Sequence, residues 1–559
     1  MQTDAAVRID PSVLVDHPLS KERIAAYDSG LVPLDRYQRD AALIAAVIPE
    51  SLRVDLGWGA EWMPWTREVV SLDEAGSPTF DFEETDRLAK LLDHAGARPY
   101  WSYCYVPAAA RPAGGDWRAM AEDDSTWVRT VQAYVAGLRR RGVAVGYHEI
   151  YNEPDLRDER TGEATFYAGR LEDYLDLYRA TSRTIRAADP TARVGGPALA
   201  VPADHAEWLD AFLRTVDDEG LPLDFLSFHH YGHFGLEAAL RNVREALSRH
   251  PALRHVELHL NEYNAYPIDY PRGGLQDGHH LAATFACEIA RLLGHRELTR
   301  THWAQFLDSG HGNFSGMVDI DGVPKPIYAV YRFYQRMPVD RVRAQVAGPP
   351  GVGALASADA ERSAAMVWNR HIADVTVDLR VPPDVTDVAV VLVGEDGVAD
   401  ERHVSPTDGA IGLPLSRGAV ALVSWGEPPP EPTRRRAWGV PVVTDPGHPG
   451  WSDLDEATAT FRFGTGAGGG WLVHGADLLD DDVDDWHVTA RAADGSPAQA
   501  AVRIRHEDGE DGALEATEPL RDEDLPDRPR PRGGHRVYVA AHAPAGTFVT
   551  VAPRQWSSS

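Results

Sequence analysis

DSTWVRTVQAYVAGLRRRGVAVGYHEIYN, residues 124–152, joins a helical pattern directly to a strand pattern. Apolar residues recur at three- and four-residue spacing over 124–142, which predicts an amphipathic helix. β-branched and aromatic residues are frequent over 144–152, and a turn follows them, which predicts a strand. A helix followed at once by a strand is the repeating unit of parallel α/β folds.

The same alternation extends on both sides of this stretch, from about residue 40 to 335. Strands are expected at 52–58, 98–106, 144–152, 192–199, 224–232, 256–264 and 301–308, with a weaker candidate near 64–71, and helices at 82–96, 124–142, 170–189 and 281–295. Repeated units of this kind imply parallel strands with right-handed helical crossovers. Seven or eight of them over this length fit a (β/α)8 TIM barrel better than an open sheet.

The pattern changes after Met337, where short period-two alternation with Gly and Asp turns replaces the long helices, as in DVTVDLRV and RGAVALVSW. Such alternation is typical of an antiparallel β-sandwich. A Pro-rich, charged stretch then predicts a linker. The expected division is a (β/α)8 barrel at 1–337, a β-sandwich at 338–426, a linker at 427–436 and a C-terminal β-rich domain at 437–559, with residues 1–15 as candidates for an extra sandwich strand.

The composition narrows the choice of partners. The 559 residues include 55 Lys and Arg against 85 Asp and Glu, a formal net charge of −30. Such an excess repels phosphate backbones and anionic lipid surfaces, so we expect no nucleic-acid or membrane partner. The N-terminus shows no basic segment followed by an apolar one, which predicts a cytoplasmic protein; a homo-oligomer is compatible with these features. Two cysteines, Cys104 and Cys287, exclude a disulfide framework.

Two glutamates stand at the ends of separate strand-like runs. Glu153 lies between Asn152 and Pro154, and Glu262 follows the run VELHLN. The carboxyl ends of barrel strands carry the active site, so two such side chains can converge across the barrel mouth. One protonated acid and one carboxylate are what cleavage of a glycosidic bond requires. Glu149, on the same strand as Glu153, is interpreted as an ion-pairing residue without a catalytic role.

HEIYNEPDL, RVGGPAL, LSFHHYG, HLNEYNAYP, HWAQFLD and KPIYAVYRFY follow one another along the chain. In this order they resemble glycoside hydrolase family 39, which contains β-xylosidases, α-L-iduronidases and some arabinose-releasing enzymes and belongs to a large clan of barrel glycosidases. The resemblance covers roughly residues 50–340 and the general character of the sandwich. It implies retaining double displacement on an oligosaccharide or other glycoside, with no metal and no cofactor.

The resemblance also implies roles for individual residues. Glu153 becomes the general acid/base and Glu262 the nucleophile, which in this clan follow barrel strands four and seven. Six further positions match sugar-contacting positions or are expected to line the pocket. They are Asn152 beside the sugar 2-hydroxyl, His229 with Tyr231 on strand six, Trp303 as the aromatic floor under the sugar, and Asp55 with Trp58 where the first strand ends.

Three departures from the family pattern bear on which sugar the enzyme accepts. Tyr151 stands where Trp usually precedes Asn-Glu-Pro, Asn261 where Thr usually precedes the nucleophile, and Asp55 near a position where β-xylosidases commonly have His. The expected function is an exo-acting β-D-xylosidase for short oligosaccharides. The alternative is an α-L-arabinofuranosidase or another pentose- or galactose-releasing glycosidase. A uronic acid is disfavoured, because the strand-end motifs offer few basic residues to its carboxylate.

Two other classes of protein share parts of this pattern. A metal-dependent barrel hydrolase would use the histidines near the strand ends, but their spacing matches no compact zinc motif, and adjacent His229 and His230 point to opposite faces of a strand. A non-catalytic sugar-binding protein is disfavoured because both glutamates are present. The acidic run 480–482 lacks the regular ligand spacing of a calcium loop and predicts a solvated turn.

Overall fold

The computed structural model describes residues 3–427 with short gaps, and beyond them mainly the backbone of strands between Trp438 and Pro553. The gaps before residue 428 are at 16–17, 29–35, 38–39, 48–49, 59, 61–69, 75, 122, 159, 267–276 and 310–314.

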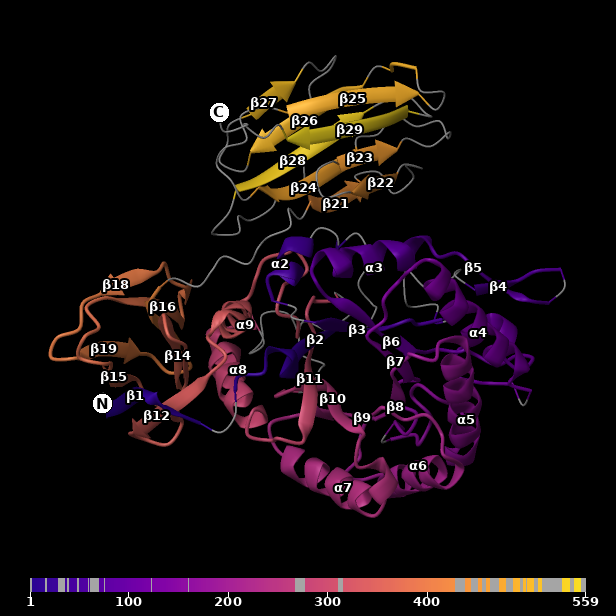
Figure 1. Ribbon diagram of the computed structural model, residues 1–559, viewed down its shortest axis with the longest axis horizontal. Helices are drawn as coiled ribbons and strands as arrows, with labels where there is room; N and C mark the ends of the chain where they lie inside the picture. Colours follow the sequence, from indigo (N-terminus) through magenta and orange to yellow (C-terminus); the bar gives the residue numbers. More distant parts are fainter. Residues whose placement is uncertain are drawn as a thin grey trace.

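Eight parallel strands close into a barrel, and helices form a ring around it (Figure 1). The order around the barrel is β10-β11-β2-β3-β6-β7-β8-β9, so the predicted (β/α)8 fold is confirmed. The barrel strands are β2 (Ile24–Asp28), β3 (Ser51–Asp55), β6 (Arg98–Tyr103), β7 (Tyr147–Ile150), β8 (Val194–Leu199), β9 (Phe225–Tyr231), β10 (Glu257–Asn264) and β11 (Leu298–Ala304). The helices are α2 (Ala41–Ala45), α3 (Glu83–His94), α4 (Ser125–Arg140), α5 (Leu171–Ala188), α6 (Ala206–Glu219), α7 (Leu236–Ser248), α8 (His279–Leu292) and α9 (Pro326–Arg336), with 3-10 turns η1 (Lys21–Arg23), η2 (Ala108–Ala110) and η3 (Pro251–Leu253).

The first barrel strand is β2, not the weak candidate near 64–71. That prediction is wrong: residues 61–69 lie outside the described part of the chain, and β4 (Val70–Leu72) pairs with β5 (Pro78–Phe80) in a separate two-stranded sheet. β2 reads Ile-Ala-Ala-Tyr-Asp and is buried throughout, so it shows no alternation and is too short to stand out as an apolar run. With β2 counted, the run at 52–58 is strand two, Glu153 follows strand four and Glu262 lies on strand seven.

Helix α4 illustrates how an apolar face covers the barrel. On α4, Trp127, Val131, Tyr134 and Leu138 are buried at spacings of three and four residues, the pattern that predicts this helix from sequence. Such packing fixes the strand ends, and therefore the residues that follow them, against a rigid outer layer.

A second sheet follows the barrel in the chain and also includes the N-terminal strand β1. Its order is β17-β16-β20-β14-β13-β12-β1-β15-β19, with β18 paired to β16, and β1 (Thr3–Leu14) lies between β12 and β15. Val377 of β15 and Val390 of β16, far apart in this order, share one buried apolar cluster, so the sheet folds over on itself as a sandwich. The other strands are β12 (Arg341–Ala347), β13 (Val352–Ala358), β14 (Arg362–Asn369), β15 (Val375–Arg380), β16 (Val388–Gly394), β17 (Gly397–Val398), β18 (Arg402–Val404), β19 (Ala410–Leu415) and β20 (Val420–Gly426).

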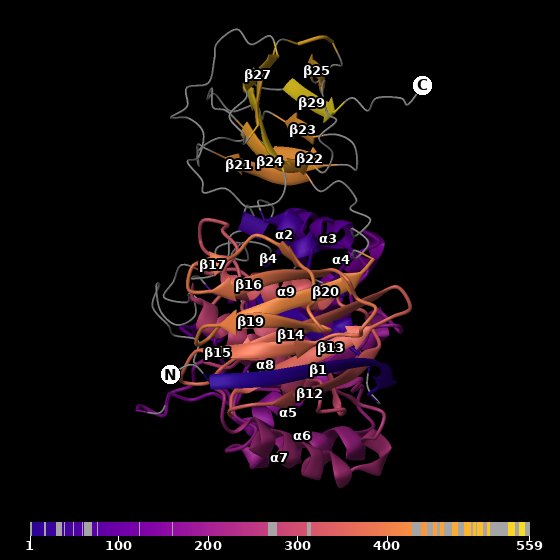
Figure 2. The same cartoon turned by 90° about the vertical axis from the view of Figure 1, so that its left-hand side faces the viewer.

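The sandwich packs on α8 and α9 (Figure 2). Met366 and Trp368 of β14 and Leu422 of β20 belong to the same apolar cluster as the barrel helices. Barrel and sandwich therefore share a core rather than being joined by a linker alone.

The C-terminal region consists of two more antiparallel sheets, which lie beside α2 and α3 (Figures 1 and 2). One has the order β21-β24-β28-β26-β27 and the other β22-β23-β29-β25. Their strands are β21 (Trp438–Val443), β22 (Trp451–Leu454), β23 (Ala459–Arg462), β24 (Leu472–Leu478), β25 (Trp486–Ala492), β26 (Ala501–His506), β27 (Asp511–Leu514), β28 (His535–His542) and β29 (Thr547–Pro553). The expected linker at 427–436 and the acidic run at 480–482 fall, apart from Glu427, outside the described residues, and the domain boundaries stay predictions. Among the described helices, none has the length and apolar character needed to cross a membrane.

Candidate active site

Glu153 lies on the turn that follows strand four. β7 ends at Ile150, and Tyr151 and Glu153 have φ angles of 73° and 44°, in the left-handed region that non-glycine residues rarely adopt and that recurs at functional sites. The Glu153 amide donates to the carbonyl of Ala198, 3.1 Å away at the end of β8. This turn holds the carboxyl at the barrel mouth, where the residue is only 8% exposed.

Glu262 is directed into the barrel by a β-bulge in β10. The pairing of β10 with β9 shifts by one residue between Leu260 and Glu262, which makes Asn261 the extra residue. A bulge of this kind allows two successive side chains to face the same way. Asn261 Nδ2 donates to the hydroxyl of Tyr100 (3.2 Å), and Glu262 Oε1 accepts from Arg53 (2.9 Å), both inside the barrel.

The two glutamates meet around one histidine. His229 Nδ1 lies 2.8 Å from Glu153 Oε1 and 3.6 Å from Glu262 Oε2, and one oxygen of each carboxyl lies within 4.8 Å of the other. Retaining glycosidases hold their two carboxyls about 5–5.5 Å apart, whereas inverting enzymes need about 6.5–9.5 Å to admit a water molecule. The spacing therefore fits direct attack by one carboxylate.

A buried guanidinium holds the carboxyl groups in place. Arg53, on β3, is fully buried and donates to Glu149 (2.7 Å), Glu262 (2.9 Å) and the amide oxygen of Asn152 (2.9 Å). Its Nη1 also lies 3.3 Å from Asp55. Glu149 thus has the ion-pairing position expected from the sequence, and one cation balances three neighbouring carboxyls.

Arg53 and Tyr27 are site residues that the sequence analysis did not identify. The Tyr27 hydroxyl donates to Asp55 (2.9 Å), and the Arg53 guanidinium lies 4.7 Å from the centre of the Tyr27 ring. Arg53 and Asp55 are two residues apart and therefore share one face of a strand. Opposite charges at this spacing in a buried strand are the signal that could have identified Arg53. Tyr27 lies on β2, the strand that was not predicted.

Burial and neighbouring charge separate the two catalytic candidates. Burial raises the pKa of Glu153 to about 8, and the charge of Asp155 adds to this increase. Burial also raises the pKa of Glu262, but His229 and the adjacent Arg53 charge oppose this increase. Burial lowers the pKa of His229 to about 4, so its imidazole is neutral at pH 7. Both pKa values are therefore raised, and the Arg53 charge beside Glu262 favours Glu153 as the carboxyl that holds a proton.

Three other predicted residues also lie at this site. Tyr231 donates its hydroxyl to Glu262 Oε2 (2.7 Å). Asn152 is held between Arg53 and the hydroxyl of Tyr105, 3.3 Å from its Nδ2. Asp55 completes the group, so Asn152, His229, Tyr231 and Asp55 all contact the network that surrounds the glutamates.

Trp303 and Trp58 are not brought to the glutamates. The Trp303 ring packs against Phe285 of α8 at 4.6 Å between centroids, and the Trp58 ring packs against Tyr134 of α4 at 5.0 Å. Both rings lie in the layer between barrel and helices and are about 1% exposed. The inward-facing residue next to Trp303 is His302, because successive side chains of a strand alternate in direction. The expected aromatic floor and the expected pocket position of Trp58 are therefore corrected.

The group Glu153, His229 and Glu262 is also where a cation could be held among the described residues. His230 points outward, with its ring 6.4 Å from that of Tyr263 in the helix layer, so it is unsuited to act as a fourth ligand. Positive charge is already supplied 2.9 Å from Glu262 by Arg53. This arrangement fits a carboxylate pair sharing a proton better than a resident metal.

Comparisons with known proteins identify the family of this chain. The sequence profile described as "Glycosyl hydrolases family 39" matches residues 50–406. A β-xylosidase of Caldicellulosiruptor saccharolyticus is 24% identical over 366 residues, which cover 60% of this chain and 71% of the relative.

Two solved structures share the fold. The GH39 enzyme of Xanthomonas axonopodis pv. citri has a TM-score of 0.62 at 19% identity and covers 77% of this chain and 98% of its own. The bacterial orthologue of human α-L-iduronidase has a TM-score of 0.60 at 14% identity, and the match covers 98% of this chain and 97% of that structure's chain. This similarity of fold therefore extends to the C-terminal sheets. Because the family profile spans most of the barrel and the sandwich, the chain belongs to the glycosyl hydrolases of family 39, and it is a retaining O-glycosyl hydrolase.

Proposed function

We propose that this chain is an exo-acting β-D-xylosidase in which Glu153 is the general acid/base and Glu262 is the nucleophile. The observation that carries the assignment is the contact of both carboxyls with His229 Nδ1, at 2.8 and 3.6 Å. Of these two carboxyls, Glu262 is the one that also pairs with Arg53. This asymmetry supports two different roles for two chemically identical side chains.

In the first step, the Glu262 carboxylate attacks the anomeric carbon as the bond to the leaving oxygen breaks. Glu153 gives its proton to that oxygen, and a glycosyl ester of Glu262 forms. Esterification removes the negative charge of Glu262, which lowers the pKa of Glu153. In the second step, the ionised Glu153 takes a proton from water, the water oxygen attacks the anomeric carbon, and Glu262 is released.

Three neighbours support this chemistry. Arg53 and Tyr231 donate to separate oxygens of Glu262 and hold the carboxylate in one orientation. The resemblance to family 39 assigns Asn152 to the sugar 2-hydroxyl, and Arg53 and Tyr105 hold its side chain immediately before Glu153 in the chain. Preorganised donors of this type stabilise charge without reorganisation during the reaction.

The β-D-xyloside is proposed because the similar protein of Caldicellulosiruptor saccharolyticus is named a β-xylosidase. Among the described residues, the fully buried cation at the glutamates is Arg53, which is already engaged by carboxyls. That arrangement disfavours a uronic acid, whose own carboxylate needs a cation. Exo-action on short oligosaccharides, a cytoplasmic location and a homo-oligomeric state stay predictions.

The test is hydrolysis of p-nitrophenyl β-D-xyloside, α-L-arabinofuranoside, α-L-arabinopyranoside, β-D-galactoside and α-L-iduronide. We expect the highest kcat/KM for the xyloside, with β-xylose as the first product seen by NMR before mutarotation. Faster release from any other member of the panel would replace the xyloside as the substrate. First formation of α-xylose would contradict the roles of the two glutamates.

A further inference from the structure

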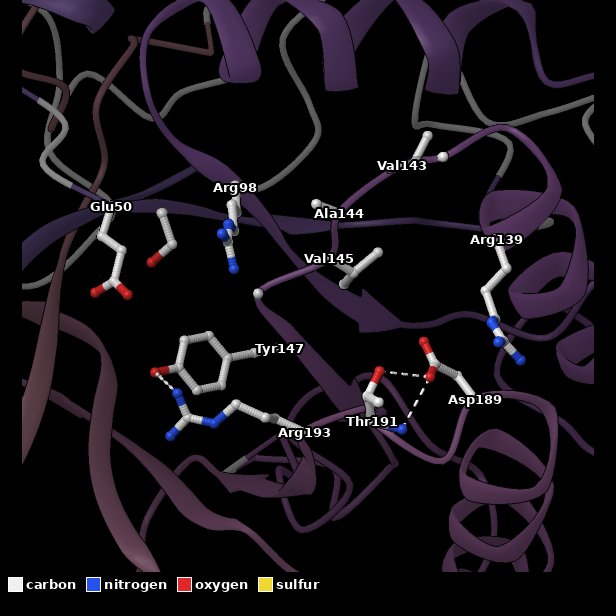
Figure 3. Close-up of a pocket in the computed structure, with 13 residues that line it drawn as sticks. Glu50, Arg98, Arg139, Val143, Ala144, Val145, Tyr147, Asp189, Thr191 and Arg193 are labelled. Carbon is white, nitrogen blue, oxygen red and sulfur yellow. Dashed lines mark hydrogen bonds between the residues drawn. The ribbon is translucent and has the colours of Figure 1, made fainter.

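A cavity of about 480 Å³ lies at the amino end of the barrel, away from the glutamates (Figure 3). Its walls come from the residues that begin or immediately precede β3, β6, β7 and β8, together with the end of α4 and the segment after it. Glu153, in contrast, follows the last residue of β7. The cavity and the catalytic pair therefore lie at opposite ends of the same strands.

Three arginines and two carboxylates line this cavity. Among the described residues, the exposed Arg98 guanidinium forms no ion pair or hydrogen bond, and Arg139 donates only to the carbonyl of Ala188. Arg193 also lines the cavity and donates to the hydroxyl of Tyr147 (2.7 Å). In Figure 3 the Arg98 side chain projects into the space bordered by Tyr147, with Arg139 on the far side.

The carboxylates that line the cavity are already engaged. Glu50 is paired with Arg300 at 2.7 Å. Asp189 accepts from the amide and the hydroxyl of Thr191, at 2.9 and 2.7 Å. Arg193 is paired with Glu257, so Arg98 and Arg139 are the cations that retain free donors. In a chain of net charge −30, a concave surface on which Arg98 has no carboxylate partner among the described residues departs from the general pattern of the molecule.

We propose that this cavity is a second binding site, for a sugar-sized phosphate monoester. Its volume lies in the range of about 300–1,000 Å³ typical of small-molecule sites, so it accommodates an organic anion rather than a bare ion alone. Guanidinium groups bind phosphate through paired N–H donors. Arg98 and Arg139 come from different elements, β6 and α4, so they can approach a tetrahedral phosphate from two sides.

Calorimetric titration of the full chain tests this site without requiring turnover. The probes are glucose 6-phosphate, glucuronate, inorganic phosphate and glucose. We expect glucose 6-phosphate to bind most tightly, glucuronate more weakly because it carries one negative charge, and glucose not at all. The affinity for the phosphate ester should fall as NaCl concentration rises.

Matched substitutions locate the binding. Arg98→Gln and Arg139→Gln should each weaken binding of glucose 6-phosphate about tenfold or more, since each removes a charge-assisted hydrogen bond. Arg140→Gln, one residue further along α4 and outside the cavity lining, should bind as the wild type does. Equal affinity in all three variants would place the ligand elsewhere and overturn the proposal, as would absence of binding. Tighter binding of inorganic phosphate than of the ester would reduce the site to one for a free anion and overturn the assignment to an ester.

Discussion

The two ends of the barrel differ in how their charged side chains are buried and paired. At the carboxyl end, Glu149, Glu262 and Asp55 are buried around the single guanidinium of Arg53. At the amino end, three arginines and two carboxylates line an open cavity, and Arg98 has no carboxylate partner among the described residues (Figure 3). The same strands supply both ends, so the difference comes from burial and from the order of residues along each strand.

This difference determines how costly a substitution is. A buried carboxyl that loses its counter-charge is destabilised strongly, because water cannot replace the lost partner. An exposed arginine remains hydrated whether or not it has a partner, and its removal usually changes stability little. The comparison is therefore tested most sharply by changing charges at the carboxyl end.

Removing the nucleophile should have the largest effect. Glu262→Ala should reduce kcat by about 10⁴-fold or more, since no group remains to form the glycosyl ester. Azide added to this variant should restore turnover of an activated β-xyloside and give the α-glycosyl azide, measured by NMR. Rescue that instead gives the β-azide would exchange the roles of Glu262 and Glu153.

Removing the acid should have an effect that depends on the leaving group. Glu153→Ala should lower kcat for xylobiose by about 10²–10⁴-fold, because the departing alkoxide then lacks a proton. Glycosylation by 2,4-dinitrophenyl β-D-xyloside should be slowed much less, because its leaving group needs no proton. Pre-steady-state measurement of dinitrophenol release separates this step from hydrolysis of the ester. Equal loss with both substrates would contradict the assignment of Glu153.

Removing the shared guanidinium tests the balance of charge directly. Arg53→Met should lower the free energy of unfolding by about 3–5 kcal/mol, because it leaves buried carboxyls without a counter-charge. Urea denaturation measures this loss. The control is Arg160→Met, whose side chain is 90% exposed and should cost about 0.5 kcal/mol or less. Similar costs for the two variants would remove the distinction between buried and exposed charge.

The dependence of activity on pH should follow the proton on Glu153. Its pKa is raised by burial to about 8, so the acid form is present below pH 8 and is lost as the pH rises through this value. The kcat/KM for xylobiose should therefore fall about tenfold per pH unit above 8. In Glu153→Gln, which does not titrate, the residual activity should lack this alkaline decrease. If the alkaline decrease persists in Glu153→Gln, it comes from the titration of another group.

The barrel and its catalytic pair could be predicted from sequence because both depend on local patterns. Seven strands have apolar or aromatic runs that are visible without tertiary information, and both glutamates follow such runs. β2 could not be recognised, since five buried residues carry no periodic signal. The inward direction of both Asn261 and Glu262 depends on a bulge in β10, which strict alternation does not foresee.

The direction of the Trp303 side chain was also not predictable from sequence, although its position along the strand was. The motif HWAQFLD places it correctly on strand eight, but the direction of its side chain depends on the register of that strand, and a shift of one residue reverses the face. Its indole packs against Phe285 rather than facing the glutamates. A motif therefore predicts a position along a strand more securely than it predicts a contact with substrate.

Substitution of Trp303, whose side chain faces the helix layer, should have the smallest effect on catalysis. Trp303→Phe should lower the free energy of unfolding by about 1–3 kcal/mol through lost packing, and it should leave kcat and KM within about twofold. Tyr231→Phe is the matched comparison, because it removes a hydroxyl that donates to Glu262 at 2.7 Å. It should reduce kcat about tenfold or more, since a hydrogen bond to a charged group is lost. If KM for Trp303→Phe instead rises by as large a factor as kcat falls in Tyr231→Phe, Trp303 does contact the sugar. The substrate pocket would then extend into the layer between barrel and helices.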